Sequence, residues 1–238
     1  VFEKHKKSDK MRLAAVCMNQ GSAGTIASGM YLHKKFPHIL VGCSEALQCP
    51  TLLNNGYGDH RIEGIGDKHV PFILNCRDQD VVLAINDEAA ISMFRLFNTP
   101  EGHQALKKHG VSQEVIDQLN NFGISGCANI IGLIKMAKHF EFNENDVLVT
   151  VATDSAEMYQ SRLVEQEKIK GKYTVEQAYA DYFRYVLGVT DDHLEEMTYT
   201  ARKRIHGLKY FTWVEQRGKT VEELDAQWYN PEYWDAQM

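Results

Sequence analysis

The stretch Gln20-Gly21-Ser22-Ala23-Gly24-Thr25 decides the fold, because this run of small residues separates an apolar segment from one with helical spacing. Residues 13–18 are all apolar, which predicts a buried strand. Over residues 25–36 the larger apolar side chains recur at helical spacing, and Pro37 should end the helix, since the residue before a proline avoids helical geometry. Residues 39–43 are apolar again. The sequence therefore predicts a strand, a loop, a helix and a second strand.

A small-residue loop that leads into a helix favours phosphate binding, because the first N–H groups of a helix have no partner within it and the helix dipole is positive there. A nucleoside triphosphate would need a lysine followed by Ser or Thr, and none follows Gly24. A dinucleotide would find a suitably placed carboxylate in Glu45, but the glycine pattern differs from G-x-G-x-x-G. A compact monophosphate, such as that of pyridoxal phosphate, is the third interpretation.

Composition sets the protein class. The 238 residues are 44% hydrophobic and 24% charged, as in ordinary soluble globular proteins. No apolar run could span a membrane, and a net charge of −6 gives no reason to expect a nucleic-acid partner. The five cysteines are odd in number and lack CxxC spacing, so we expect buried free thiols, a cytoplasmic location and no metal site.

The chain divides into residues 1–162, predicted as an α/β domain incomplete at its N-terminus, and residues 163–238, predicted as a helical C-terminal extension. Thr174 to Gln177 and Thr220 to Glu223 have the pattern of capping boxes that open helices. The aromatic residues of the extension are expected to pack onto the α/β body or onto a partner subunit.

Within the first part, strands are predicted at 81–85 and 147–151, the second one buried, and helices at 87–97 and from about 122. Residues 98–120 are interpreted as an insertion, with a turn at Pro100-Glu101-Gly102 and a small helix that starts near Ser112.

A second polar stretch, Thr153-Asp154-Ser155, follows the strand at 147–151. The carboxyl ends of the strands are where open α/β sheets bind ligands. The Ser155 hydroxyl could donate a hydrogen bond to a pyridine nitrogen there, and a helix cap is the alternative interpretation.

Together these stretches resemble the β-family of pyridoxal-phosphate enzymes, fold type II, in its cysteine synthase and cystathionine β-synthase branch. The resemblance implies an α/β fold with a three-layer, open, mostly parallel sheet flanked by helices, equivalent to part of the family's large domain. The matching stretches, in the family's order, are Gln20 to Thr25, His60 to Gly66 with Val70-Pro71, Asn86 to Ala89, Gly123 to Gly126 with Ala128, and Thr153 to Ser155 with Tyr159.

By that resemblance, the cofactor is pyridoxal 5′-phosphate and the substrate a small amino acid. Its phosphate would bind Gly21, Ser22, Ala23, Gly24 and Thr25, its pyridine nitrogen would contact Ser155, and the substrate cleft would be lined by Gly64, Ile65 and Gly66. A neutral hydroxyl at the ring nitrogen limits electron withdrawal, which implies β-elimination or β-replacement on serine- or cysteine-type substrates. The sequence does not specify the nucleophile or leaving group.

The family's Schiff-base lysine lies in a domain well over a hundred residues before the phosphate loop, whereas only about twenty residues precede Gly21. We therefore assign no catalytic residue and expect an N-terminal lysine-bearing segment or a separate subunit, in a homo-oligomer such as a dimer. Two alternatives stay open: an NAD(P)-dependent oxidoreductase, and a non-catalytic subunit that keeps the fold.

Overall fold

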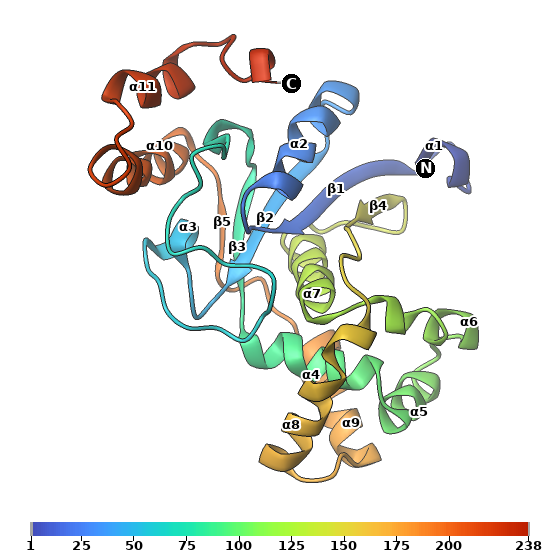
Figure 1. Cartoon of the computed structure of the whole chain (residues 1–238). Coiled ribbons are helices and arrows are strands. Elements are labelled where there is room, and N and C mark those ends of the chain that lie inside the picture. The colour runs from blue at the N-terminus through green and yellow to red at the C-terminus, as the bar shows by residue number, and fades with distance from the viewer. Residues whose placement is uncertain (1, 238) are drawn as a thin grey trace.

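The structure is a computed structural model that describes residues 2–237. Five strands form one sheet in the order β4-β1-β2-β3-β5 (Figure 1). The first four are parallel, and β5 runs antiparallel to β3. The strands are β1 Arg12–Asn19, β2 Leu40–Ala46, β3 Val81–Ile85, β4 Asp146–Val149 and β5 Leu194–Glu196. The predicted open, mostly parallel sheet is confirmed.

Helices cover both faces of the sheet, as the three-layer prediction requires. On β1, Val16 packs in one apolar cluster beside helix α2 (Gly24–Lys35), and Cys17 packs in the other against α7 (Ile124–His139). Helix α7 lies close to the sheet at Gly132, where an added Cβ would be 2.6 Å from the Cys17 sulfur. Because successive side chains of a strand point to opposite faces, consecutive residues of β1 pack into opposite cores.

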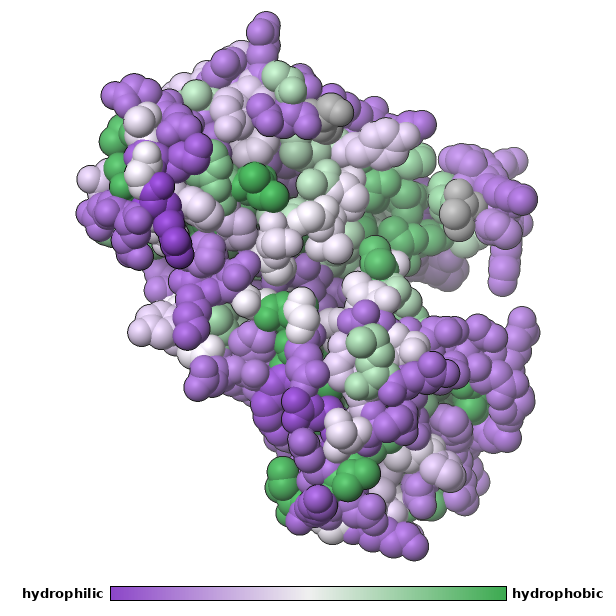
Figure 2. Space-filling model, viewed as in Figure 1, coloured by the Kyte–Doolittle hydropathy of each residue, from purple (hydrophilic) through white to green (hydrophobic). Residues whose placement is uncertain are grey.

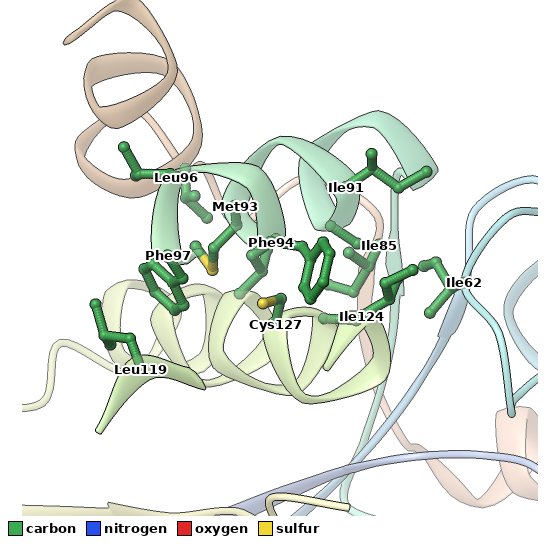
Figure 3. Close-up of a cluster of buried hydrophobic side chains, with 14 of the residues drawn as sticks. Ile62, Ile85, Ile91, Met93, Phe94, Leu96, Phe97, Leu119, Ile124 and Cys127 are labelled. Atoms are coloured by element: carbon green, nitrogen blue, oxygen red, sulfur yellow. The ribbon is translucent and has the colours of Figure 1, made fainter. Parts of the chain in front are cut away.

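The larger core lies between α7 and α4 (Asp87–Phe97), with Phe94 at its centre (Figure 3). Ile62, from the irregular segment that follows β2, reaches into this core and is fully buried. The core therefore fixes one end of the segment that carries Gly64 to Gly66.

The remaining elements are short helices, and most of them lie below the sheet or at its far left in Figure 1. They are α1 Phe2–His5, α3 Thr51–Asn54, α5 Pro100–Lys108, α6 Gln113–Ile116, α8 Gln160–Lys170, α9 Val175–Tyr182, α10 Tyr199–Lys209 and α11 Val221–Tyr229, with 3-10 turns at Cys76–Asp78, Leu119–Asn121, Ala156–Tyr159 and Asp235–Gln237 and π-helical turns at Phe183–Leu187 and Tyr210–Val214.

Both predicted capping boxes are present, at Thr174 with Gln177 and at Thr220 with Glu223. The turn predicted at Pro100 is wrong. The Thr99 side chain accepts a hydrogen bond from the Gly102 N–H, and Pro100 begins α5, where its missing N–H costs nothing and its fixed φ suits the helix.

The extension is not purely helical, because β5 adds an antiparallel edge strand to the sheet beside β3. Several of its aromatic residues pack onto the α/β body, as expected, whereas others, such as Phe183 and Phe211, are exposed. Tyr173 and Tyr182 are buried in the larger core, and Trp228 is buried in the core on the α2 side.

Strand β4 is not buried as predicted, since all four of its residues are half-buried. It forms the edge of the sheet, and its α2 side borders a groove of about 560 Å³ lined by apolar residues such as Leu13, Val147 and Val149. Hydrophobic residues are visible at this place next to α1 (Figure 2).

The five cysteines are all free and buried, which confirms the prediction of free thiols. Among the helices of residues 2–237, none is long and apolar enough to cross a membrane.

The last turn of α2 is tied to the sheet by a charged cluster. His33 lies between two carboxylates, with Nδ1 2.8 Å from Asp78 and Nε2 3.0 Å from Asp80, and Asp80 also pairs with Arg202 of α10 at 3.2 Å. Burial lowers the pKa of His33, but the hydrogen bonds and charges of Asp78 and Asp80 outweigh it, so the pKa lies above its ordinary value of 6.5. The imidazolium is therefore favoured by folding.

This cluster predicts a pH-dependent difference between the wild type and His33→Asn. A raised folded-state pKa means that the stabilisation by His33 is fully present below the unfolded-state pKa and is lost as the pH rises through the folded-state value. The difference in unfolding free energy between the two proteins should be larger at about pH 6 than at about pH 9, as measured by urea unfolding. A difference that does not change with pH would show that His33 stabilises α2 without its charge.

Candidate functional site

A cavity of about 410 Å³ lies at the carboxyl end of β1, between the loop that opens α2 and the chain that leaves β4. Six of the nine predicted site residues line it: Gly21, Ser22, Gly24, Thr25, Gly64 and Ile65. Its other walls are formed by Met18, Asn19, Ser125, Asn129, Val151, Thr153 and Asp154. The structure thus brings together stretches that are far apart in the sequence.

The loop before α2 presents unpaired backbone donors. Within residues 2–237, the N–H groups from Gly21 to Thr25 donate no hydrogen bond to the protein. Ala23 sits at the N-cap with φ 73°, a left-handed conformation that costs a non-glycine residue about 1–2 kcal/mol. The Thr25 hydroxyl donates to the Asn19 carbonyl at 3.1 Å, which leaves its oxygen lone pairs free. The loop therefore offers several donors and a strained turn, as anion-binding loops do.

The cavity also has room for a group that contacts this loop. A Cβ added to Gly24 or Gly64 would meet no atom within 4 Å, although both residues line the cavity. The open space thus lies directly over the N-terminus of α2. A compact phosphate fits this combination of free donors, helix N-terminus and open glycines.

The floor of the cavity is a buried polar network. Asn19 donates from Nδ2 to the Ser125 carbonyl at 2.6 Å and accepts from the Ser44 hydroxyl at 2.7 Å. Asn129 accepts from the Asn19 N–H at 2.8 Å and donates to the Val151 carbonyl at 3.0 Å. These bonds fix β1, β2, α7 and the chain after β4 to one another. Sequence reasoning did not identify Asn19 or Asn129, which lie more than a hundred residues apart and are joined only in the fold.

The Gly64-Ile65-Gly66 segment forms the wall beside the loop at residues 20–25. Both glycines have φ 82°, which favours glycine, and a Cβ on Gly66 would be 2.2 Å from Nε2 of His60. The Gly66 N–H donates to the Gln20 carbonyl at 3.0 Å, so the segment is hydrogen-bonded to the loop before α2. Gly66 positions the wall but is not among the residues that line the cavity.

Ser155 lies beside the cavity, where its neighbours Thr153 and Asp154 form the wall. It precedes the 3-10 turn at Ala156–Tyr159, and its side chain caps no N–H group of that turn. The Thr153 hydroxyl lies 2.9 Å from the Ser125 hydroxyl. A role for Ser155 at a ring nitrogen stays a prediction.

The turn at 153–155 is anchored to the start of α7. The Tyr159 hydroxyl donates to Asp154 at 2.9 Å, and the Gly123 N–H donates to the Asp154 carbonyl at 2.7 Å. Burial, followed by the hydrogen bond to Asp154, raises the pKa of Tyr159 to about 12, so the phenol keeps its proton. A Cβ at Gly123 would be 2.7 Å from the Tyr159 ring and 2.8 Å from the Asp154 carbonyl.

Gly123→Ala should therefore push the turn away from α7 and destabilise the protein by about 1–3 kcal/mol, the usual cost of overpacking. Gly207→Ala is the matched control, since it lies inside α10 with open space around it and should stabilise by roughly 0.5–1 kcal/mol. Thermal unfolding of both variants would measure this. Equal stability changes would show that the contact at Gly123 is not strained by a methyl group.

Glu45 does not reach the cavity. It is 2% exposed, and its carboxylate accepts from the N–H groups of Leu52 and Leu53 at 3.0 and 2.8 Å. Burial raises its pKa to about 7, although these hydrogen bonds act to lower it. The carboxylate that suggested a dinucleotide ribose site is thus used to cap α3.

In the part of the chain that the structure describes, no group of three or more His, Cys, Asp or Glu residues could hold a metal ion.

No family model matches the chain. Cysteine synthase B of Campylobacter jejuni is 32% identical over 142 residues, which make up 59% of this chain and 40% of that protein. A cysteine synthase of Staphylococcus aureus is 28% identical over the same length. The matched segment thus spans about two fifths of these relatives.

Solved structures of two enzymes share the fold of this chain. O-acetylserine sulfhydrylase isoform 3 of Entamoeba histolytica has a TM-score of 0.54 at 22% identity, covering 74% of this chain and 46% of that one. A hydrogen sulfide-producing enzyme of Fusobacterium nucleatum has a TM-score of 0.52 at 23% identity, covering 75% and 47%. The resemblance to the cysteine synthase branch of fold type II is confirmed, and so is the fold class.

Proposed function

We propose that this chain, which is similar to cysteine synthases, is the cofactor-binding part of a pyridoxal-phosphate enzyme. The reaction would be β-elimination or β-replacement on a serine- or cysteine-type amino acid. The observation that carries the proposal is the row of N–H groups from Gly21 to Thr25 that have no partner within residues 2–237, on a loop that lines a cavity at the carboxyl end of β1.

In this proposal Gly21, Ser22, Ala23, Gly24 and Thr25 hold the cofactor phosphate with backbone N–H groups at the positive end of the α2 dipole. Pyridoxal phosphate, when bound, supplies the electron sink for chemistry at the substrate α-carbon. The buried network of Asn19 and Asn129 keeps the cavity floor rigid beneath it.

The substrate would lie along Gly64, Ile65 and Gly66, where the absence of a side chain on Gly64 permits close approach. The ring nitrogen would face the opposite wall, at residues 153–155, and Ser155 is the proposed neutral partner. A hydroxyl there leaves the ring less electron-withdrawing than a carboxylate would, which favours loss of a β-substituent over transamination.

A lysine that binds the cofactor would come from a segment or subunit outside this chain, in a homo-oligomeric cytoplasmic enzyme. A non-catalytic subunit with the same fold is the alternative. It would follow if the natural protein binds the cofactor without any lysine linkage.

The test is to purify the protein from its natural source and treat it with borohydride, which fixes a pyridoxal–lysine linkage covalently. Intact-mass and peptide analysis should then locate a phosphopyridoxyl-lysine on polypeptide outside residues 1–238. A colourless protein that takes up NAD and no pyridoxal phosphate would contradict the proposal. Bound cofactor with no modified lysine would favour the non-catalytic alternative.

A further inference from the structure

The segment that carries the substrate-cleft wall continues into an irregular stretch held by the C-terminal extension. Residues 67–75 contain no helix or strand, so their carbonyl groups need partners from elsewhere. Three alternate carbonyls of this stretch accept hydrogen bonds from side chains of the extension. They are Val70, bound by Trp213 Nε1 at 2.8 Å, Phe72, bound by Lys209 Nζ and Gln227 Nε2 at 2.9 Å each, and Leu74, bound by Lys209 Nζ at 2.6 Å.

Lys209 is the centre of this contact. Its side chain is fully buried, and its third acceptor is Gln227 Oε1 at 2.7 Å. Burial lowers its pKa to about 8, while three oxygen acceptors match the three N–H bonds of the ammonium group. A lysine buried in this way is not a solvated surface charge, and its bonds hold the stretch in one position.

Among these donors, Trp213 binds the carbonyl that is nearest to Gly66 in the sequence. Besides its hydrogen bond to Val70, its ring packs against His69 at 5.6 Å and Phe72 at 5.5 Å between centroids. Val70 is four residues after Gly66 and is 1% exposed. The stretch of chain between the wall of the cavity and the contact with the extension is therefore short.

The other end of the segment is fixed as well. Ile62 is buried in the larger core, the Thr51 hydroxyl binds the Asp67 carbonyl at 2.7 Å, and the Gly66 N–H binds Gln20 beside the phosphate loop at 3.0 Å. A shift of the stretch at Val70 can reach the phosphate loop through Gly66.

We infer that the C-terminal extension is a working part of the site, and that Trp213 and Lys209 are positioning residues for the wall formed by Gly64 to Gly66. The inference rests on the proposed function, because it concerns the cavity in which the cofactor would bind. It gives the extension a role beyond packing. Without its hydrogen bonds, the wall and the phosphate loop beside it are less well ordered for a ligand.

Trp213→Phe tests this with little change in volume, since it keeps an aromatic ring and removes the N–H donor. Trp234→Phe is the matched control, because the Trp234 indole donates at 2.9 Å to the Gln227 carbonyl within the extension and not to the cleft segment. The probe is pyridoxine 5′-phosphate, which needs no lysine, measured by calorimetry. Hydrogen exchange of residues 64–72 and the unfolding temperature are recorded on the same proteins.

Loss of one hydrogen bond should raise the Kd of Trp213→Phe about three- to tenfold and speed exchange over residues 64–72, with wild-type values for Trp234→Phe. The two variants should unfold at similar temperatures. Wild-type affinity in Trp213→Phe, or an equal loss in Trp234→Phe, would overturn the inference and leave the proposed function standing. A wild-type protein that does not bind the probe would overturn the proposed function, and the inference with it.

Discussion

Aspartate in place of Gly24 is expected to weaken binding of pyridoxine 5′-phosphate strongly while the fold stays intact. Gly24 begins α2 and lines the cavity, and an added Cβ would meet no atom within 4 Å. The new carboxylate would therefore occupy the place proposed for the phosphate. Two like charges about 4 Å apart at a protein surface repel by roughly 4 kcal/mol, so the Kd should rise on the order of a hundredfold or more.

The same substitution should not weaken the protein. An acidic residue in the first turn complements the helix dipole by about 0.3–1 kcal/mol, and replacing glycine removes backbone freedom from the unfolded chain. Calorimetry with pyridoxine 5′-phosphate and urea unfolding measure the two effects separately. Gly24→Asn is the control for size, since it adds similar bulk without charge and should lose much less affinity. Equal losses in both variants would show that space, and not charge, governs the loop.

Truncation of Phe94 to alanine is expected to have the largest effect on stability, a loss of about 3–5 kcal/mol. The ring is 1% exposed and lies at the centre of the core between α4 and α7 (Figure 3). Its ring also packs edge-on against the ring of Tyr159, with 6.1 Å between centroids. Because the Tyr159 hydroxyl binds Asp154, the cavity left behind would lie beneath the turn at 153–155.

Urea unfolding gives the stability change, and Phe211→Ala is the matched control. The Phe211 side chain is 56% exposed, so its removal should change the free energy of unfolding by less than about 0.5 kcal/mol. A loss below about 1 kcal/mol for Phe94→Ala would mean that the core repacks around the missing ring.

The loop at residues 20–25, between β1 and α2, could be predicted because its signal is local. Small residues at 21–24, an apolar run before them and helical spacing after them are all read from one short stretch, and the structure places the loop as expected. The capping boxes at Thr174 and Thr220 are equally local, since each satisfies its own helix.

Features that depend on contacts with other elements of the fold could not be predicted in this way. Glu45 looked available for a ribose, but N–H groups of α3 take its carboxylate. Strand β5 is short and becomes a strand only by pairing with β3. Lys209 has no sequence signal at all, because its three acceptors belong to residues far away in the chain or on another helix.

The central claim is that the loop from Gly21 to Thr25 binds the phosphate of a pyridoxal-type ligand. The most direct measurement is a calorimetric titration of this chain with pyridoxine 5′-phosphate, with pyridoxine and NAD in parallel. We predict saturable binding of the phosphate ester, with pyridoxine at least about tenfold weaker and no binding of NAD. Equal affinity for pyridoxine and its phosphate, or binding of NAD alone, would contradict the claim.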